Sequence, residues 1–335
     1  MQLNKRLFSD FMYTIVLCIH WKKICYVKKI YKTYFLGNKI PYLHKIKKSG
    51  YMLGATIGDI AGSVYEGRNT KDYNFEMFPL GSNFTDDTVM TMAVAEWAVK
   101  NDITAGADVQ TSLLEETMVD VAINVPCPMG GYGGGFRTWL FHPERLIDYR
   151  TGKPASGRCP YNSWGNGSAM RTSAIGWLYG DMETTLKVAE TAAAITHNHP
   201  EGIKGAQAVS AAIFMARNGA LKGEIKEYIS AKFHYNLDTP WEYLHRTYGW
   251  DSSCQGTVPQ AIIAFLVSDD FESAIRRAIS IGGDSDTLAC ITGSIAEAYY
   301  KHIPEYMVDK AMSLLPGRFK KVLEIMGERG YLRNW

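Results

Sequence analysis

From residue 51 to the end of the chain, apolar residues recur at intervals of three and four rather than two. This spacing places them on one face of a helix, whereas a strand would show alternation. Alanine is frequent in several of these stretches, which favours helix and permits close packing between helices. The pattern predicts an all-α fold, with helices over residues 54–66, 86–100, 108–123, 168–179, 183–195, 200–218, 258–267, 270–280, 285–300, 305–313 and 318–328.

Between residues 126 and 167 the helical pattern gives way to glycine, proline and aromatic residues. Helices are predicted on both sides of this stretch. A long segment with little periodicity inside a compact domain is more often a functional loop than a linker. We therefore expect residues 126–167 to contribute to a binding site.

The charge of the chain is distributed unevenly along its length. The net charge is +2, but the first 50 residues carry eleven lysines and arginines against the single acid Asp10, which leaves the remainder at −8. Such an extension is typical of a nucleic-acid-binding or membrane-binding arm, of a targeting segment, or of residues outside the functional unit. The longest apolar run, Phe11 to Trp21, is too short to span a bilayer and is followed by two lysines.

We favour the third interpretation, because Met52 directly precedes a glycine-rich helix start and could act as the initiator of the compact part. The predicted organisation is a basic extension over residues 1–51 and a single all-α domain over residues 52–335, which at 46% hydrophobic residues for the whole chain can bury a sizeable core. Neither nucleic acid nor a stable membrane association is expected. The six cysteines form no CxxC pair, which indicates a reduced, cytoplasmic protein.

Two short acidic runs, each at the start of a predicted helix, are the most informative motifs. They are Thr85-Asp86-Asp87-Thr88 and Gly282-Gly283-Asp284-Ser285-Asp286-Thr287, about two hundred residues apart. Threonine and aspartate at a helix start also serve as plain caps, and acids there complement the helix dipole by roughly 0.3–1 kcal/mol each. Their oxygen atoms are equally the hard donors that Mg²⁺, Mn²⁺ or Ca²⁺ prefers, so the two runs predict a cation site if the fold brings them together.

Three further motifs accompany the acidic runs. Gly165 and Gly167 precede the helix predicted from residue 168, where backbone N–H groups and the side chains of Ser168 and Arg171 suit a phosphate, although a simple tight turn is the alternative.

Gly54, Gly58 and Gly62 lie four apart on the first helix and predict close packing of another helix. Asp59 and Glu66 share one face of that helix, being seven residues apart. His197 and His199 lie at a helix junction and make a poor zinc site.

Taken together, these motifs resemble the ADP-ribosylglycohydrolase family, which includes the dinitrogenase reductase-activating glycohydrolases. The resemblance covers about residues 52–330 and rests on Gly58-Asp59 with Glu66, Thr85-Asp86-Asp87-Thr88, Trp164-Gly165-Asn166-Gly167-Ser168-Ala169-Met170-Arg171, Thr196-His197 and Gly283-Asp284-Ser285-Asp286-Thr287. It implies a compact orthogonal bundle of helices with a binuclear centre of two Mg²⁺ or Mn²⁺ ions.

The resemblance also implies roles for individual residues. The metal ligands would be Thr85, Asp86, Asp87, Asp284, Asp286 and Thr287. The substrate would be bound by Gly165, Asn166, Gly167, Ser168 and His197, and Tyr132 or Phe136 would stack on the adenine or close over the ribose. The catalytic carboxylates would be Glu66 and Asp87, with Glu66 favoured as the acid or base and Asp87 chiefly as a ligand.

The function that follows is a metal-dependent hydrolase that removes ADP-ribose from modified protein side chains, with ADP-ribosylarginine as the favoured substrate. One alternative is hydrolysis of free ADP-ribose derivatives or nucleoside-type substrates. A second alternative, from a different class, is a non-catalytic member that binds ADP-ribose or keeps the fold as a crystallin-like protein. Loss of a metal ligand would mark such a member, and all six candidate ligands are present.

Overall fold

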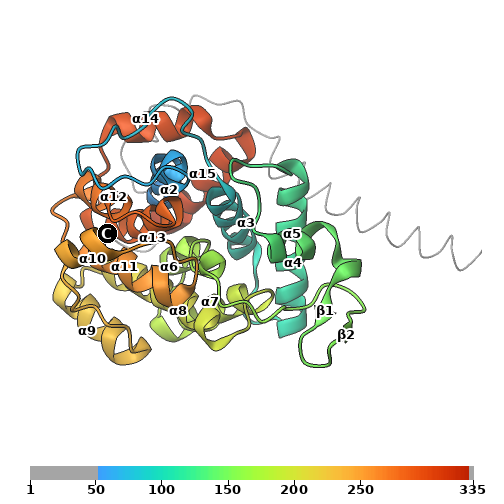
Figure 1. Ribbon diagram of the computed structural model, residues 1–335. Helices are drawn as coiled ribbons and strands as arrows, with labels where there is room; N and C mark the ends of the chain where they lie inside the picture. The colour runs from blue at the N-terminus through green and yellow to red at the C-terminus, as the bar shows by residue number, and fades with distance from the viewer. Residues whose placement is uncertain (1–51, 332–335) are drawn as a thin grey trace, which may run out of the picture. The chain divides into compact units, whose positions relative to one another are not determined.

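The computed structural model describes residues 52–331, and its helices confirm the all-α prediction (Figure 1). The basic segment predicted over residues 1–51 lies outside the described residues. The elements are α2 (Leu53–Glu66), α3 (Asp86–Lys100), α4 (Ala107–Asn124), α5 (Gly134–Phe141), the 3-10 turn η2 (Pro143–Arg145), β1 (Ile147–Asp148), β2 (Lys153–Pro154), the 3-10 turn η3 (Asn166–Ser168), α6 (Ser173–Leu178), α7 (Met182–Ala194), α8 (Pro200–Arg217), α9 (Lys222–Phe233), α10 (Trp241–Thr247), α11 (Cys254–Leu266), α12 (Phe271–Ser280), α13 (Ser285–Tyr300), α14 (Glu305–Leu314) and α15 (Gly317–Tyr331).

Helices α2 and α13 pack against each other along their whole lengths, because glycines on α2 remove the side chains that would separate them. A β-carbon at Gly54 would lie 2.2 Å from the carbonyl oxygen of Gly293, and one at Gly58 would lie 2.0 Å from that of Ala289. The predicted close packing at these glycines is thereby confirmed. The two helices run in opposite directions, so Glu66 at the end of α2 comes beside the start of α13.

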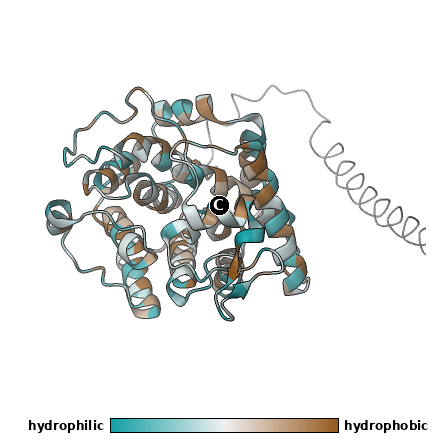
Figure 2. Ribbon diagram, turned by 45° about the vertical axis from the view of Figure 1, so that its right-hand side comes forward, coloured by the Kyte–Doolittle hydropathy of each residue, from teal (hydrophilic) through white to brown (hydrophobic). Residues whose placement is uncertain are grey.

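The other helices surround this pair with a core of small and branched side chains. Helix α13 contacts α8, α11 and α12 as well as α2. The alanines of α8, among them Ala208 and Ala212, are fully buried and allow neighbouring helices to approach closely. Figure 2 shows hydrophobic and hydrophilic residues on opposite sides of several helices, as the sequence periodicity predicts. Within residues 52–331, no helix combines the length and hydropathy needed to cross a membrane.

Several elements differ from the sequence prediction, and helices α9 and α10 were not predicted at all. The expected helix over residues 168–179 is instead η3, a break, and α6 from Ser173. The glycine-rich segment contains a helix, α5, because Phe136, Trp139 and Leu140 are spaced three and four apart and are buried together. Helix α11 begins at Cys254 rather than at residue 258, since the side chain of Ser253 caps it by accepting from the N–H of Gly256 at 3.0 Å.

Candidate metal centre and ligand loop

The start of α3 is held by an aspartate from α2. Asp59 is fully buried and accepts hydrogen bonds from the backbone N–H of Thr85 (3.0 Å), the hydroxyl of Thr85 (2.7 Å) and the N–H of Thr88 (3.0 Å). Thr85 Oγ1 in turn accepts from the N–H of Asp87 at 3.2 Å. Since Asp59 and Thr85 satisfy the first N–H groups of the helix, the carboxylates of Asp86 and Asp87 are not needed for capping.

The start of α13 is held differently. Asp284 occupies the cap position but makes no capping hydrogen bond, and it follows Gly282 and Gly283, whose φ angles are +78° and +76°. Asn69 fixes this turn: its Oδ1 accepts from the N–H of Gly283 at 2.8 Å, and its Nδ2 donates to the carbonyl of Gly283 at 2.9 Å. Nδ2 also lies 3.1 Å from the carbonyl oxygen of Glu66, so one side chain joins the end of α2 to the turn before α13.

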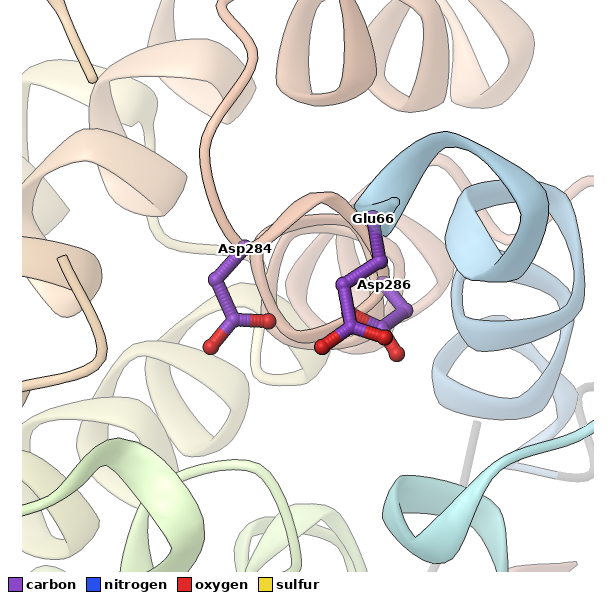
Figure 3. A group of neighbouring side chains, drawn as sticks. All are labelled: Glu66, Asp284 and Asp286. Atoms are coloured by element: carbon purple, nitrogen blue, oxygen red, sulfur yellow. The ribbon is translucent and has the colours of Figure 1, made fainter. Parts of the chain in front are cut away.

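The two acidic runs meet in the structure. Thr287 Oγ1 donates to Asp87 Oδ2 at 3.3 Å, which links the first turns of α13 and α3. Oxygen atoms of Glu66, Asp284 and Asp286 lie within 4.8 Å of one another, and Figure 3 shows their carboxylates gathered at the start of α13. We call the carboxylates of Glu66, Asp86, Asp87, Asp284 and Asp286 the acidic cluster.

Burial and mutual repulsion raise the pKa values within the acidic cluster. Burial and the nearby charge of Asp59 raise the pKa of Asp86 to about 8, and the pKa of Asp87 lies well above its ordinary value for the same reasons. The pKa of Asp286 is likewise raised well above normal by burial and by the charges of Asp284 and Asp87. Burial raises the pKa of Glu66, and the charge of Asp284 adds to the effect. Negative charge therefore accumulates here at a cost that a bound cation would remove.

The donor atoms fit a hard divalent cation. Every candidate ligand in the two runs offers a carboxylate or hydroxyl oxygen, which Mg²⁺ and Mn²⁺ prefer. Asp87 Oδ1 is buried without a hydrogen-bond partner among the described residues, and such an atom is costly unless something binds it. We therefore conclude that the residues present suit a cation, with Glu66, Asp284 and Asp286 nearest to one another.

The predicted ligand loop lies directly beside the acidic cluster. Asn166 Nδ2 donates to Asp284 Oδ2 at 2.8 Å and to Thr257 Oγ1 at 3.0 Å, and the backbone N–H of Asn166 donates to the carbonyl of Ser252. His197 borders the same loop, because its Nε2 would lie 3.2 Å from a β-carbon at Gly167. A side chain at Gly167 would therefore require the ring of His197 to shift by a few tenths of an ångström.

Two side chains of the loop motif are buried and pair with backbone carbonyls of the protein. The hydroxyl of Ser168 is fully buried and donates to the carbonyl of Gly202 at 2.7 Å. Arg171 is 1% exposed, and its guanidinium donates to the carbonyl of Ala192 at 2.8 Å. The prediction of a helix start that presents both side chains to a phosphate was wrong, since η3 is a single 3-10 turn. A ligand contact by Ser168 stays a prediction that would have to involve its backbone.

Tyr132 is also turned inward. Its hydroxyl donates to the carbonyl of Val125 at 2.7 Å, and its ring contacts Phe136 and Phe141. Stacking of Tyr132 or Phe136 on an adenine stays a prediction, because both side chains are 8% exposed.

Comparison with known proteins identifies the family. The family model described as ADP-ribosylglycohydrolase matches residues 44–329. The chain belongs to the ADP-ribosylglycohydrolase family. It is therefore a hydrolase of glycosidic bonds, and the predicted resemblance is confirmed.

Relatives of this chain include ADP-ribosylhydrolase ARH3 of Mus musculus, 26% identical over 76% of this chain and 85% of the relative. ADP-ribosyl-[dinitrogen reductase] glycohydrolase of Rhodospirillum rubrum is 24% identical over 75% of this chain and 84% of the relative. A solved structure named ADP-ribosylglycohydrolase-related protein complex matches with a TM-score of 0.58 and 23% identity, covering 84% of this chain and 94% of that one. That likeness supports the fold.

Some residues that build the site were not indicated by any sequence pattern. Asn69 and Thr257 position the Gly283 turn and Asn166 respectively, yet neither lies in a recognisable motif. Lys71, whose Nζ donates to the carbonyl oxygens of Tyr248 and Ile281, was also missed. These side chains act on the backbone or side chains of residues far away in sequence, which no local pattern reveals.

Proposed function

We propose that this chain is a metal-dependent hydrolase that removes ADP-ribose from modified protein side chains, with ADP-ribosylarginine as the favoured substrate. The observation that carries the proposal is the junction of the two acidic runs, where Thr287 Oγ1 meets Asp87 Oδ2 at 3.3 Å and three further carboxylates converge. The relatives named as ADP-ribosyl hydrolases support the choice of substrate class.

Two Mg²⁺ or Mn²⁺ ions would be held by Thr85, Asp86, Asp87, Asp284, Asp286 and Thr287. When bound, such ions orient ribose hydroxyls and acidify water. The closeness of Glu66 to Asp284 and Asp286 also qualifies Glu66 as a ligand, alongside its proposed acid or base role.

Hydrolysis at the anomeric carbon of ribose passes through an oxocarbenium-like centre and needs an activated water and help for the leaving group. Glu66 suits proton transfer because its pKa is raised by burial and it is only half-buried, so a water can reach it. Asp87 is more deeply enclosed, being 3% exposed, and suits a ligand role better. Gly165, Asn166, Gly167 and His197 would hold the diphosphate and ribose beside the acidic cluster.

Arginine is favoured as the acceptor because the motifs resemble the bacterial members of the family, and ADP-ribosyl-[dinitrogen reductase] glycohydrolase of Rhodospirillum rubrum is among the relatives. The carboxylates of the acidic cluster give no separate argument for arginine, since bound cations would neutralise much of their charge. The net charge of −8 on residues 51–335 favours the approach of a cationic acceptor over longer distances.

The test is to incubate the purified chain with ADP-ribosylated arginine and serine peptides and with O-acetyl-ADP-ribose, with and without Mg²⁺, and to measure release of ADP-ribose. We expect Mg²⁺-dependent release that is fastest from the arginine peptide. Asp286→Asn should abolish it, whereas Asp309→Asn, at an exposed aspartate of α14, should leave it unchanged. Release from O-acetyl-ADP-ribose alone would favour the small-molecule alternative, and no release from any substrate would contradict an enzymatic role.

A further inference from the structure

Arg171, Thr196 and His197 form a chain of hydrogen bonds that ends at the ligand loop. Arg171 Nη2 donates to Thr196 Oγ1 at 2.8 Å, and Thr196 Oγ1 lies 2.7 Å from His197 Nδ1. Thr196 is fully buried and Arg171 is 1% exposed. The proposed function gives His197 a ligand contact but assigns no role to the two residues behind it.

The direction of each hydrogen bond follows from the chemistry of the groups. A guanidinium has only donors, so Thr196 Oγ1 must be the acceptor in its bond with Arg171. The hydroxyl hydrogen of Thr196 is then free to point elsewhere, and His197 Nδ1 is the acceptor that lies within reach among the described residues. A buried hydroxyl seldom leaves its hydrogen unpaired. Nδ1 is therefore unprotonated.

With Nδ1 unprotonated, the neutral imidazole carries its hydrogen on Nε2. The doubly protonated ring is disfavoured, because burial, aided by the charge of Arg171, lowers the pKa of His197 well below its ordinary value. Nε2 would lie 3.2 Å from a β-carbon at Gly167 and 3.7 Å from one at Gly165. No residue within 52–329 accepts a hydrogen bond from it.

We propose that Arg171 and Thr196 are positioning residues that hold His197 in its Nε2–H tautomer, so that it offers a fixed N–H donor to an oxygen atom of the ligand at the Gly165–Gly167 loop. The inference rests on the proposed function for the identity of the ligand. The tautomer itself is a property of the free protein. The buried Arg171 is thus used indirectly: it sets the orientation of a neutral donor instead of meeting the phosphates itself.

The tautomer is measured directly by long-range ¹H–¹⁵N correlation spectra of protein labelled in its histidines, with His197→Gln to assign the signals. We expect His197 to be wholly Nε2-protonated in the unmodified protein. Thr196→Val keeps the shape of the side chain but removes the hydroxyl, and it should release the ring into a mixture of tautomers. Thr196→Ser should restore the original spectrum. Arg171→Met should also populate both tautomers, since Thr196 then lacks the donor that orients it.

Binding of ADP-ribose supplies the second readout. Losing one oriented hydrogen bond to a charged oxygen should weaken the affinity about tenfold in Thr196→Val, with recovery in Thr196→Ser. Thr185→Val is the matched control, because Thr185 is equally buried on α7 and its hydroxyl donates only to the carbonyl of Asp181. It should change neither readout.

The outcomes separate this inference from the proposed function. A His197 that is Nδ1-protonated in the unmodified protein would overturn the inference, and so would a Thr196→Val protein with unchanged tautomer and affinity. If the unmodified protein showed the Nε2–H tautomer but bound no ADP-ribose, the assignment of the ligand in both proposals would fail. The hydrogen-bond chain itself would survive that result.

Discussion

At the start of α3 the side chain of Thr85 caps the helix, whereas at the start of α13 the residue in the cap position, Asp284, makes no capping hydrogen bond. The first turn of α3 is tied to Asp59 from α2, while the turn before α13 is tied to Asn69, just beyond the end of α2. At α3 the first N–H groups are satisfied by Asp59 and Thr85. At α13 Asn69 binds only the turn before the helix, and the N–H of Thr287 donates to Asp286 Oδ1 at 3.0 Å. A helix start can therefore present carboxylates to a cation when other groups cap it, as at α3, or when its cap residue makes no capping hydrogen bond, as Asp284 does at α13.

The largest effect on stability is expected from separating α2 from the start of α13. A β-carbon at Gly62 would lie 2.5 Å from Cα of Asp286, so Gly62→Ala must push α2 away from α13. Overpacking of this kind costs about 1–3 kcal/mol, which thermal unfolding would detect. Gly67→Ala is the control, because a β-carbon there meets nothing within 4 Å. Equal stability of the two variants would contradict the close packing of α2 on α13.

The conformation of the turn before α13 should depend on the hydrogen bonds of Asn69. Asn69→Asp keeps the acceptor for Gly283 N–H but loses the donor to the carbonyl oxygens of Gly283 and Glu66. We expect the affinity for Mn²⁺ to fall about tenfold, as is typical when groups behind a metal ligand are lost. Asn218→Asp, which loses a similar bond to the carbonyl of Phe214 at the end of α8, should leave the affinity unchanged.

The start of α3 should respond to loss of its own cap. Thr85→Ala removes the hydroxyl that donates to Asp59 and accepts from Asp87 N–H, and caps of this type are worth about 1 kcal/mol. Thr85→Ser should retain most of that stability. At the other run, Ser285→Ala loses only a 3.3 Å bond to the carbonyl of Gly283 and should cost less. Urea unfolding of the three metal-free variants measures the loss of stability in each. A larger loss in Ser285→Ala than in Thr85→Ala would contradict the difference between the two helix starts.

The pH should also change the stability of the metal-free protein. The pKa of Asp86 is about 8 in the folded state against an ordinary 3.8, so the folded state binds the extra proton. The stability from this proton is complete below pH 4 and is lost as the pH rises toward 8.

Between pH 5.5 and 8 the Tm of the metal-free protein should therefore fall relative to that of Asp86→Asn, by about 2 °C or more. Taking the difference between the two proteins cancels titrating groups distant from Asp86, including His197, but it includes the change in the pKa of Asp87, to which the charge of Asp86 contributes. Added Mg²⁺ should remove the fall by favouring the ionised carboxylates. A Tm difference that does not change with pH would show that the carboxylates of the acidic cluster repel one another less than the structure implies.

The sequence predicts most of the helices but not α5, α9 or α10. The predicted ones have a clear local periodicity, and the spacing of Gly54, Gly58 and Gly62 correctly indicates the close packing of α2. The two acidic runs were also recognisable as helix starts. The structure adds the residues that hold them: Asp59 was recognised on the face of Glu66 and in the family resemblance but without a role, and no sequence pattern indicated Asn69. Hydrogen bonds between residues far apart in the chain produce no periodic pattern in the sequence from which they could be predicted.

Arg171 shows how a local rule can fail. Glycines followed by Ser168 and Arg171 are typical of a helix start that binds a phosphate, but the chain forms a 3-10 turn and buries both side chains. The burial partners of Arg171 come from the end of α7 and the residues after it, some twenty residues later in the sequence, with Ala192 and Thr196 among them. Tertiary contacts therefore decided what the motif presents to a ligand.

The central claim is that the two helix starts form one cation site, and calorimetric titration with Mn²⁺ tests it most directly. Asp87→Asn alters the start of α3 and Asp286→Asn alters the start of α13, and each keeps the size of the side chain. The account predicts that each variant alone weakens Mn²⁺ binding at least about a hundredfold, because both carboxylates serve the same centre. Full-affinity binding by either variant would contradict it.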